Sequence, residues 1–288
     1  MLYLQIFANG LVLGGLYACI AAGFSLVWGV LNVINILHGS FIVLGGYLAF
    51  YAYALAGVHP FLSVLIAAPV FFALGYLLQR SLINRVIAAP VLLTLTLTFG
   101  LDLMLSNAML AAFTADFKKI TLDPPLGVTF IGPVVLPVDR LLAMALALGL
   151  LGLLYLTLAR SRIGRAIVAV RMDREAAALM GVRVRDVYAV TFGLGALMAG
   201  VSGPLLALIF PISPLSGGAY LGKAFVVCVL GGLGSVPGAL VGGLTLGLAE
   251  SFGALWLGPE HASTLSFVLL IAILLVRPEG LLGRKGYA

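Results

Sequence analysis

Residues 9–49 read NGLVLGGLYACIAAGFSLVWGVLNVINILHGSFIVLGGYLA and contain no aspartate, glutamate, lysine or arginine. This charge-free run extends in both directions, since the first formally charged side chain of the chain is Arg80. One passage through a bilayer takes about 20 apolar residues, so residues 1–79 hold roughly three membrane spans. We expect these spans to be helices, because an open strand cannot satisfy its backbone hydrogen bonds in lipid.

The rest of the chain has the same apolar character. Of its 288 residues, 62% are hydrophobic and 9% are charged, and the mean hydropathy is +1.20. A soluble domain is roughly 25% charged, so this composition argues strongly against a water-soluble enzyme. The 36 glycines suit helices that pack closely in lipid. Cys19 and Cys228 lie in apolar runs, where we expect small buried side chains rather than a disulfide or a metal pair.

Further apolar stretches predict the remaining spans. They cover residues 91–113, 141–159, 187–212, 219–233, 238–256 and 262–276, and the stretch 219–233 is short for a full crossing. The sequence therefore predicts an all-α, polytopic membrane protein with eight or nine transmembrane helices, some of them short or broken. We expect residues 1–288 to form a single transmembrane domain, with no metal ion and no cofactor.

Arginine and lysine predict the orientation. Cytoplasmic loops of membrane proteins carry an excess of these residues. They gather in three places, which are Arg80 with Arg85, seven arginines between Arg160 and Arg185, and Arg277 with Arg284 and Lys285. We therefore expect these regions and the C-terminus in the cytoplasm and the N-terminus outside. The net charge of +6 is concentrated on one membrane face, and no nucleic-acid-binding fold is indicated.

Residues 160–186, RSRIGRAIVAVRMDREAAALMGVRVRD, form the most informative loop. Ile163, Ile167, Val170 and Ala177 recur at helical spacing, with arginines on the other faces. Such a segment could lie along the lipid headgroups or dock a cytoplasmic partner. Its length favours docking, as do Ala177, Ala178 and Gly181, which leave a shallow surface, while Arg171 and Arg174 offer charge to an acidic groove.

The spacing Glu175-Ala176-Ala177-x3-Gly181 resembles the coupling motif of ABC importer permeases. Together with Gly164-Arg165-Ala166, residues 9–49 and the run VLGGLGSVPGALVGG at 229–243, it resembles the LivH/LivM-type permeases of branched-chain amino acid importers. One departure is that the longer importer signature continues to a Leu-Pro, whereas Gly193-Leu194-Gly195 has no proline.

This resemblance implies a permease subunit of an ATP-driven importer in the bacterial inner membrane. It implies a second LivM-like permease subunit, two cytoplasmic ATPase subunits and a periplasmic substrate-binding protein as partners. Relatives in the family handle urea, amides or organic acids, so the cargo stays open. The docking residues it implies are Gly164, Arg165, Arg171, Arg174, Glu175, Ala176, Ala177 and Gly181.

Other functions are weaker. The chain is expected not to be an enzyme, because its one P-loop-like run, Gly217-x4-Gly222-Lys223, continues with Ala224 in place of the serine or threonine that holds magnesium. Ser202 lies in a GxSG run, as in intramembrane proteases, but the nearest downstream histidine, His261, is expected in an outer loop. An ion-coupled secondary carrier remains the alternative transporter.

Polar residues within apolar runs are candidates for the translocation pathway. Asn35 and His38 could gate or bind a carboxylate, or could cap a broken helix. Asp102 could line a cavity and meet an amino group, be protonated and hydrogen-bonded, or pair at a subunit interface. Lys223 is expected to extend to the outer surface. Gly234, Ser235 and Pro237 lie where glycine and proline interrupt an apolar run. This interruption could line the solute path or be a tight connection between two short spans.

Overall fold

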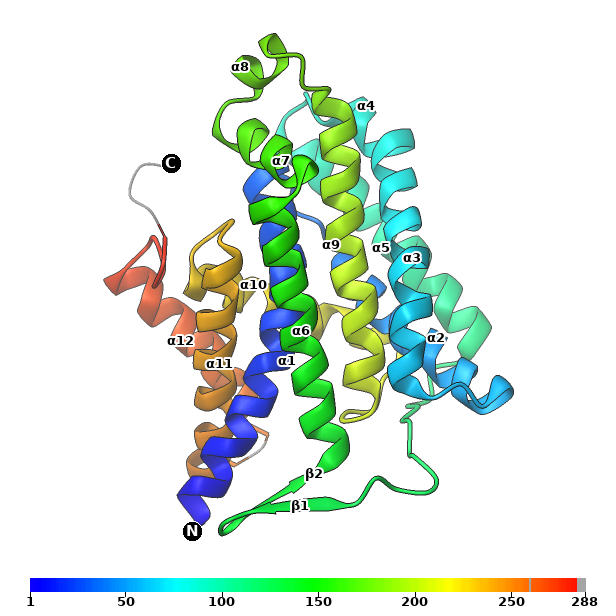
Figure 1. Cartoon of the computed structure of the whole chain (residues 1–288), viewed down its shortest axis with the longest axis vertical. Coiled ribbons are helices and arrows are strands. Elements are labelled where there is room, and N and C mark those ends of the chain that lie inside the picture. The colour runs from blue at the N-terminus through cyan, green and yellow to red at the C-terminus, as the bar shows by residue number, and fades with distance from the viewer. Residues whose placement is uncertain (259, 284–288) are drawn as a thin grey trace.

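The structure is a computed structural model that describes residues 1–258 and 260–283, so Arg284 and Lys285 lie outside the described residues. Most helices run along the long axis of the molecule (Figure 1). The α-helices are α1 (Leu2–Leu31), α2 (His38–Ala56), α3 (Pro60–Leu78), α4 (Asn84–Val86), α5 (Val91–Phe113), α6 (Val138–Arg160), α7 (Arg162–Met172), α8 (Arg174–Leu179), α9 (Val184–Ala207), α10 (Gly217–Gly231), α11 (Val236–Leu257) and α12 (Ala262–Val276).

The predicted all-α membrane architecture is confirmed. Among the described residues, eight helices are long and apolar enough to cross a membrane, and α12 contributes a shorter apolar helix. The sequence prediction missed one feature, an antiparallel hairpin of β1 (Val128–Ile131) and β2 (Val134–Pro137) in the loop before α6. This hairpin is short and largely exposed, so it has no long alternating pattern by which it could be recognised.

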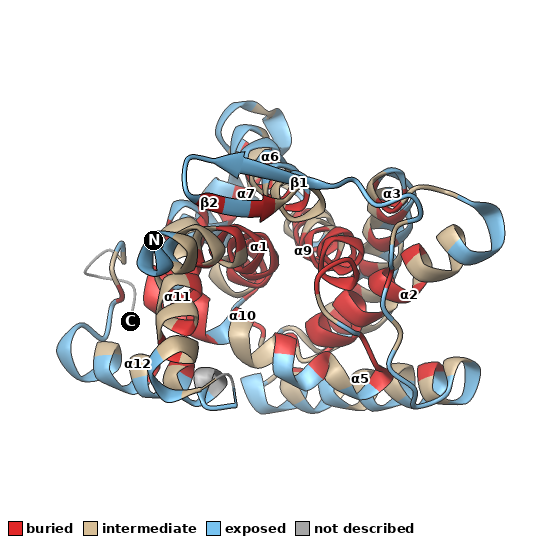
Figure 2. Ribbon diagram, turned by 90° about the horizontal axis from the view of Figure 1, so that it is seen from below, coloured by how far each residue is buried: buried red, intermediate tan, exposed pale blue. Residues whose placement is uncertain are grey.

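Helices α1 and α9 form the centre of the bundle. They are 89% and 83% buried over their most apolar windows, and Figure 2 shows them surrounded by the other helices. Glycines allow α11 to lie directly against α1. A Cβ atom on Gly14 would lie 2.7 Å from the Cα of Leu244, well inside ordinary van der Waals contact. This close crossing is the use of small residues that the glycine content predicted.

The connections that lead into α2 and α10 interrupt long apolar runs. Helix α1 ends at Leu31, Asn32 adopts a left-handed conformation with φ of 53°, and α2 begins only at His38. After α9, residues 208–216 contain a short 3-10 helix (Pro214–Ser216) before α10 begins at Gly217. The beginnings of α2 and α10 meet, because a Cβ atom on Gly217 would lie 3.2 Å from the backbone nitrogen of Ser40. The expectation of short or broken spans is therefore confirmed.

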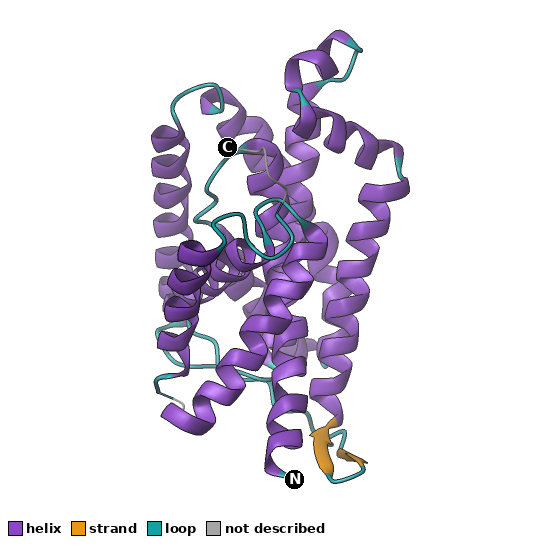
Figure 3. Ribbon diagram, turned by 90° about the vertical axis from the view of Figure 1, so that its left-hand side faces the viewer, coloured by secondary structure: helices purple, strands orange, loops and turns teal. Residues whose placement is uncertain are grey.

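The two ends of the bundle differ in character. At one end the N-terminus lies beside the hairpin (Figure 3), where the side chain of Gln5 exchanges hydrogen bonds of 2.8 and 2.9 Å with the backbone of Val135. Helices α7 and α8 lie at the opposite end. There the side-chain amide of Asn84 donates to the carbonyl of Arg185, 3.3 Å away, which brings the loop of Arg80 and Arg85 to the same end.

Candidate functional site

The predicted docking segment consists of two helices rather than one. Helix α7 ends at Met172, and Asp173 caps α8 by accepting hydrogen bonds from the backbone nitrogens of Glu175 and Ala176 at 2.8 and 3.0 Å. An aspartate at this position satisfies donors that the first turn of a helix leaves free, so it starts a new helix here. Ile163 was expected on the apolar face, but it is 52% exposed.

Gly164 allows the sharp turn between α6 and α7. The Ser161 hydroxyl accepts a hydrogen bond of 2.8 Å from the Gly164 nitrogen. A Cβ atom on Gly164 would overlap the carbonyl oxygens of Thr157 and Leu158, so only glycine fits. The following Arg165 is exposed and donates to the carbonyl of Arg160 at 3.3 Å. The glycine of this motif therefore sets the angle at which α7 leaves the bundle.

Helix α8 and the residue after it present an exposed tip, defined here as Arg174, Glu175, Ala176, Leu179 and Met180. Ala177 is buried and anchors the helix. Leu179 and Met180 are 88% and 84% exposed, and the sequence analysis did not single them out. Gly181 follows with a φ of 84°, and no atom lies within 4 Å of the position of its missing Cβ. An apolar pair flanked by charges suits a protein partner, and Figure 1 shows α8 projecting from the bundle.

Arg171 is exposed, but its guanidinium group reaches back to the bundle. Its guanidinium donates a hydrogen bond of 2.7 Å to the carbonyl of Gly234, in the connection between α10 and α11. Gly234 has a φ of 75°, and a Cβ atom there would lie 2.9 Å from the Cα of Gly29 in α1. Arg171 thus joins the predicted docking segment to the predicted helix break, two motifs that are far apart in the sequence.

The helix break itself is a capped connection. Ser235 caps α11 by accepting a hydrogen bond of 3.0 Å from the Gly238 nitrogen, and Pro237 occupies the first turn, where no donor is needed. Ser235 and Pro237 also line a cavity of about 710 Å³ together with Arg171. A second cavity of about 510 Å³ lies at the same end, and its lining includes Asn32, Arg171 and Arg174. Gly234, Ser235 and Pro237 therefore lie at the α7 end of the molecule.

Asn35, His38 and Asp102 gather around the start of α2. The ring Nε2 of His38 lies 3.0 Å from the carbonyl of Ile20 in α1. The Ser40 hydroxyl, in the first turn of α2, donates to the Asp102 carboxylate at 2.5 Å. Asn35 is fully buried, and among the described residues its side-chain amide has no hydrogen-bond partner. The structure brings these predicted residues together and adds Ser40, which the sequence analysis did not select.

Comparison with known proteins decides the family. The family described as the branched-chain amino acid transport system / permease component matches residues 6–274. The chain belongs to this family. It is 36% identical to the high-affinity branched-chain amino acid transport system permease protein BraD of Pseudomonas aeruginosa, over 98% of this chain and 96% of BraD. It is 34% identical to LivH of Escherichia coli K12, over the same shares of both chains. Among solved structures, none matches significantly.

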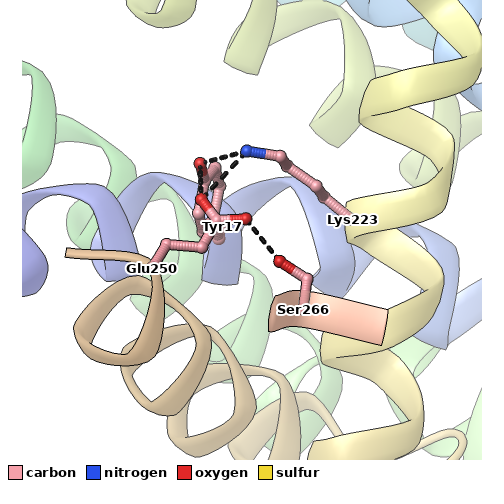
Figure 4. Close-up of polar contacts among 4 residues, drawn as sticks. All are labelled: Tyr17, Lys223, Glu250 and Ser266. Carbon is pink, nitrogen blue, oxygen red and sulfur yellow. Dashed lines mark hydrogen bonds and ion pairs between the residues drawn. The ribbon is translucent and has the colours of Figure 1, made fainter. Parts of the chain in front are cut away.

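The sequence analysis of this permease missed a second polar cluster. Lys223 of α10 and Glu250 of α11 form an ion pair of 2.9 Å, and the Tyr17 hydroxyl of α1 contacts both side chains (Figure 4). The expectation that Lys223 extends to the outer surface is wrong, because Glu250 and Tyr17 attract its ammonium group into the bundle. The signal available in the sequence was one basic and one acidic residue in neighbouring spans, since such residues in membranes usually pair.

The serine of the GxSG run has a structural role in this permease. Ser202 is buried, and its hydroxyl donates to the carbonyl of Ala199 at 2.7 Å. His261 is exposed, and its ring lies 3.1 Å from the carbonyl of Leu257. A serine nucleophile needs a histidine within hydrogen-bond reach, and the structure does not bring these two residues together.

Proposed function

We propose that this permease is the membrane subunit of an ATP-driven importer that passes branched-chain or related small amino acids across the bacterial inner membrane by alternating access. The end with α7 and α8 faces the cytoplasm, and the N-terminus faces the periplasm. A second LivM-like permease subunit forms the other wall of the translocation cavity, which lies between the two subunits. Two separate ATPase subunits bind at the cytoplasmic end, and a periplasmic binding protein delivers the amino acid. The names of BraD and LivH, both high-affinity branched-chain amino acid transport system permease proteins, support this cargo.

The observation that carries the proposal is the pairing of an exposed tip with an internal link. The α8 tip offers Leu179 and Met180 to a partner at the end of the bundle where basic residues gather. Eight residues before Leu179, the guanidinium group of Arg171 donates a hydrogen bond of 2.7 Å to the carbonyl of Gly234. A force applied to the tip therefore acts on the connection between α10 and α11. This is the arrangement that a transporter driven by separate ATPase subunits needs.

The translocation pathway in this proposal passes the start of α2. Asn35 has an unpaired amide that can bind cargo or water, and Asp102 offers a carboxylate that suits an α-ammonium group. His38 holds the start of α2 against α1 through its bond to Ile20. At the cytoplasmic end, Gly234, Ser235 and Pro237 border the path beside the cavity that Arg171 lines.

The test is leucine uptake by the assembled transporter in proteoliposomes, with and without ATP. The double variant Leu179→Asp with Met180→Asp is expected to remain in the membrane but to lose the ATPase subunits on purification. The matched control is the double variant Phe130→Asp with Ile131→Asp, two adjacent apolar positions that are 70% and 58% exposed in the hairpin at the opposite end, and it is expected to retain them.

Two results would overturn the proposal. Leucine uptake that continues after removal of the ATPase subunits would indicate an ion-coupled carrier. ATP-dependent uptake of urea, an amide or an organic acid in place of leucine would keep the ATP-driven mechanism but show that the proposed cargo is wrong.

A further inference from the structure

Lys223 is held in the membrane region by an arrangement that leaves part of its ammonium group unused. Its Nζ lies 2.6 Å from the Tyr17 hydroxyl and 2.9 Å from a Glu250 carboxylate oxygen. An ammonium group has three N–H donors, and within residues 1–258 and 260–283 no third acceptor lies within hydrogen-bond distance of this one. The Lys223 side chain is 25% exposed, whereas that of Glu250 is 7% exposed. The free N–H bond therefore belongs to the accessible member of the pair.

The carboxylate of Glu250 is fixed by three other helices. One of its oxygens accepts from Tyr17 in α1 at 2.6 Å and from Lys223 in α10 at 2.9 Å. Its other oxygen accepts from Ser266 in α12 at 2.6 Å (Figure 4). Because both oxygens are engaged, Glu250 cannot turn to take up the remaining N–H of Lys223. It acts as a fixed counter-charge that keeps the lysine charged at this depth.

Stability alone is a poor reason for this pair. Each charged side chain near the middle of a bilayer costs roughly 2.5–3.5 kcal/mol. Replacement of buried ion pairs by apolar residues of similar size is often neutral or stabilising. Hydrophobic residues at both positions would therefore join α10 to α11 at least as well. A charged pair with one free donor instead indicates that the ammonium group has a ligand.

The surface of α10 beside Lys223 is open to such a ligand. A Cβ atom on Gly222, the residue directly before Lys223, would meet only Phe267, at 3.6 Å. Phe267 is 52% exposed. The segment that carries the ammonium donor is thus bordered by the open backbone of Gly222 and the ring of Phe267.

We propose that Lys223 binds the carboxylate of the transported amino acid through its free N–H bond, while the apolar side chain of the cargo packs on Phe267. This inference rests on the proposed function. The cluster of Lys223 and Glu250 has no net charge, and a zwitterionic amino acid has none either. The cargo therefore brings no uncompensated charge into the membrane, and release needs only the exchange of one hydrogen-bonded contact.

The test removes or moves the ammonium group while the pair stays balanced. The neutral variant is Lys223→Met with Glu250→Gln, and the exchanged variant is Lys223→Glu with Glu250→Lys. Each is assembled with its partner subunits in proteoliposomes, and uptake of radiolabelled leucine per ATP hydrolysed is measured. Membrane level and thermal midpoint report folding. The conservative variant Lys223→Arg keeps a cation on α10.

We expect both double variants to fold and to bind the loaded binding protein with unchanged half-maximal concentration. Their leucine uptake per ATP should fall about tenfold or more, because a charge-assisted hydrogen bond to the cargo is lost. Lys223→Arg should stay within about threefold of wild type, since it preserves the donor.

If the pair of Lys223 and Glu250 only joined the helices, a folded double variant would take up leucine as well as the wild type does. Wild-type uptake per ATP by a folded neutral or exchanged variant would overturn the inference and leave the proposed function intact. Failure of the wild-type complex to transport leucine would instead overturn the proposed function. These two failures are therefore distinguishable in one experiment.

Discussion

Replacing Arg171 by glutamine should separate ATP hydrolysis from uptake. The shorter, neutral side chain loses the 2.7 Å hydrogen bond to Gly234 that joins α7 to the connection between α10 and α11. A hydrogen bond from a charged group contributes about 1.5–3 kcal/mol. If this bond transmits the movement of α7, its loss corresponds to roughly a 10- to 150-fold decrease in leucine moved per ATP. ATPase stimulation by the loaded binding protein should persist, because the α8 tip is unchanged.

The assay measures uptake, ATP hydrolysis and retention of the ATPase subunits in the same preparation of Arg171→Gln. Arg162→Gln is the control, since it removes the same charge from the exposed start of α7 without touching Gly234. We expect the control to match wild type. Two outcomes would refute the reasoning: coupled uptake at the wild-type level in Arg171→Gln, or loss of its ATPase subunits, which would make Arg171 a docking residue.

Three further predictions concern the docking segment, the helix packing and the pathway. Gly181→Trp should reduce ATPase retention and coupled uptake at least about tenfold below the values of Gly181→Ala. Both variants carry the strain of a φ of 84°, but only tryptophan adds bulk beside the tip, so equal behaviour of the two would contradict this prediction. Gly14→Ala should lower the free energy of unfolding by about 1–3 kcal/mol, since its Cβ would lie 2.7 Å from the Cα of Leu244. Gly149→Ala, with no atom within 4 Å of its Cβ, should be neutral or stabilising by about 0.5–1 kcal/mol, and thermal midpoints in detergent compare the two. Asp102→Asn should keep a hydrogen bond with Ser40 but lower leucine uptake about tenfold, the value of one charge-assisted contact, at unchanged membrane level; full activity would remove Asp102 from the pathway.

The span boundaries were the most predictable part of the fold. Residues 91–113 and 262–276 were predicted as spans and coincide with α5 and α12. Residues 187–212 were predicted as one span. In the structure α9 ends at Ala207, and residues 208–216 form a connection with a short 3-10 helix before α10 begins. Hydropathy cannot locate this end, since Leu208 and Ile209 are as apolar as the helix they follow.

The candidate site was predictable only in part. Asp173 divides the docking segment because it caps a helix, and a capping residue between two helical stretches can be recognised locally. The contact of Arg171 with Gly234 could not be recognised in this way, because an arginine among arginines gives no sign of its partner. The same holds for Lys223, which looked like a residue at the membrane surface until its neighbours were known.

The sequence by itself determined that the chain is a bundle of membrane helices, that its arginines and lysines gather in a few segments, and that one of these segments carries the EAA-x3-G spacing. Those properties are local, because a bilayer selects apolar runs of fixed length and the distribution of arginine and lysine selects the side. Only the tertiary structure decided that Tyr17 meets Glu250 and that Arg171 meets Gly234, residues 233 and 63 positions apart. Helices that are apolar on every face carry no periodic signal of which face turns inward, so their order and rotation depend on packing between distant segments.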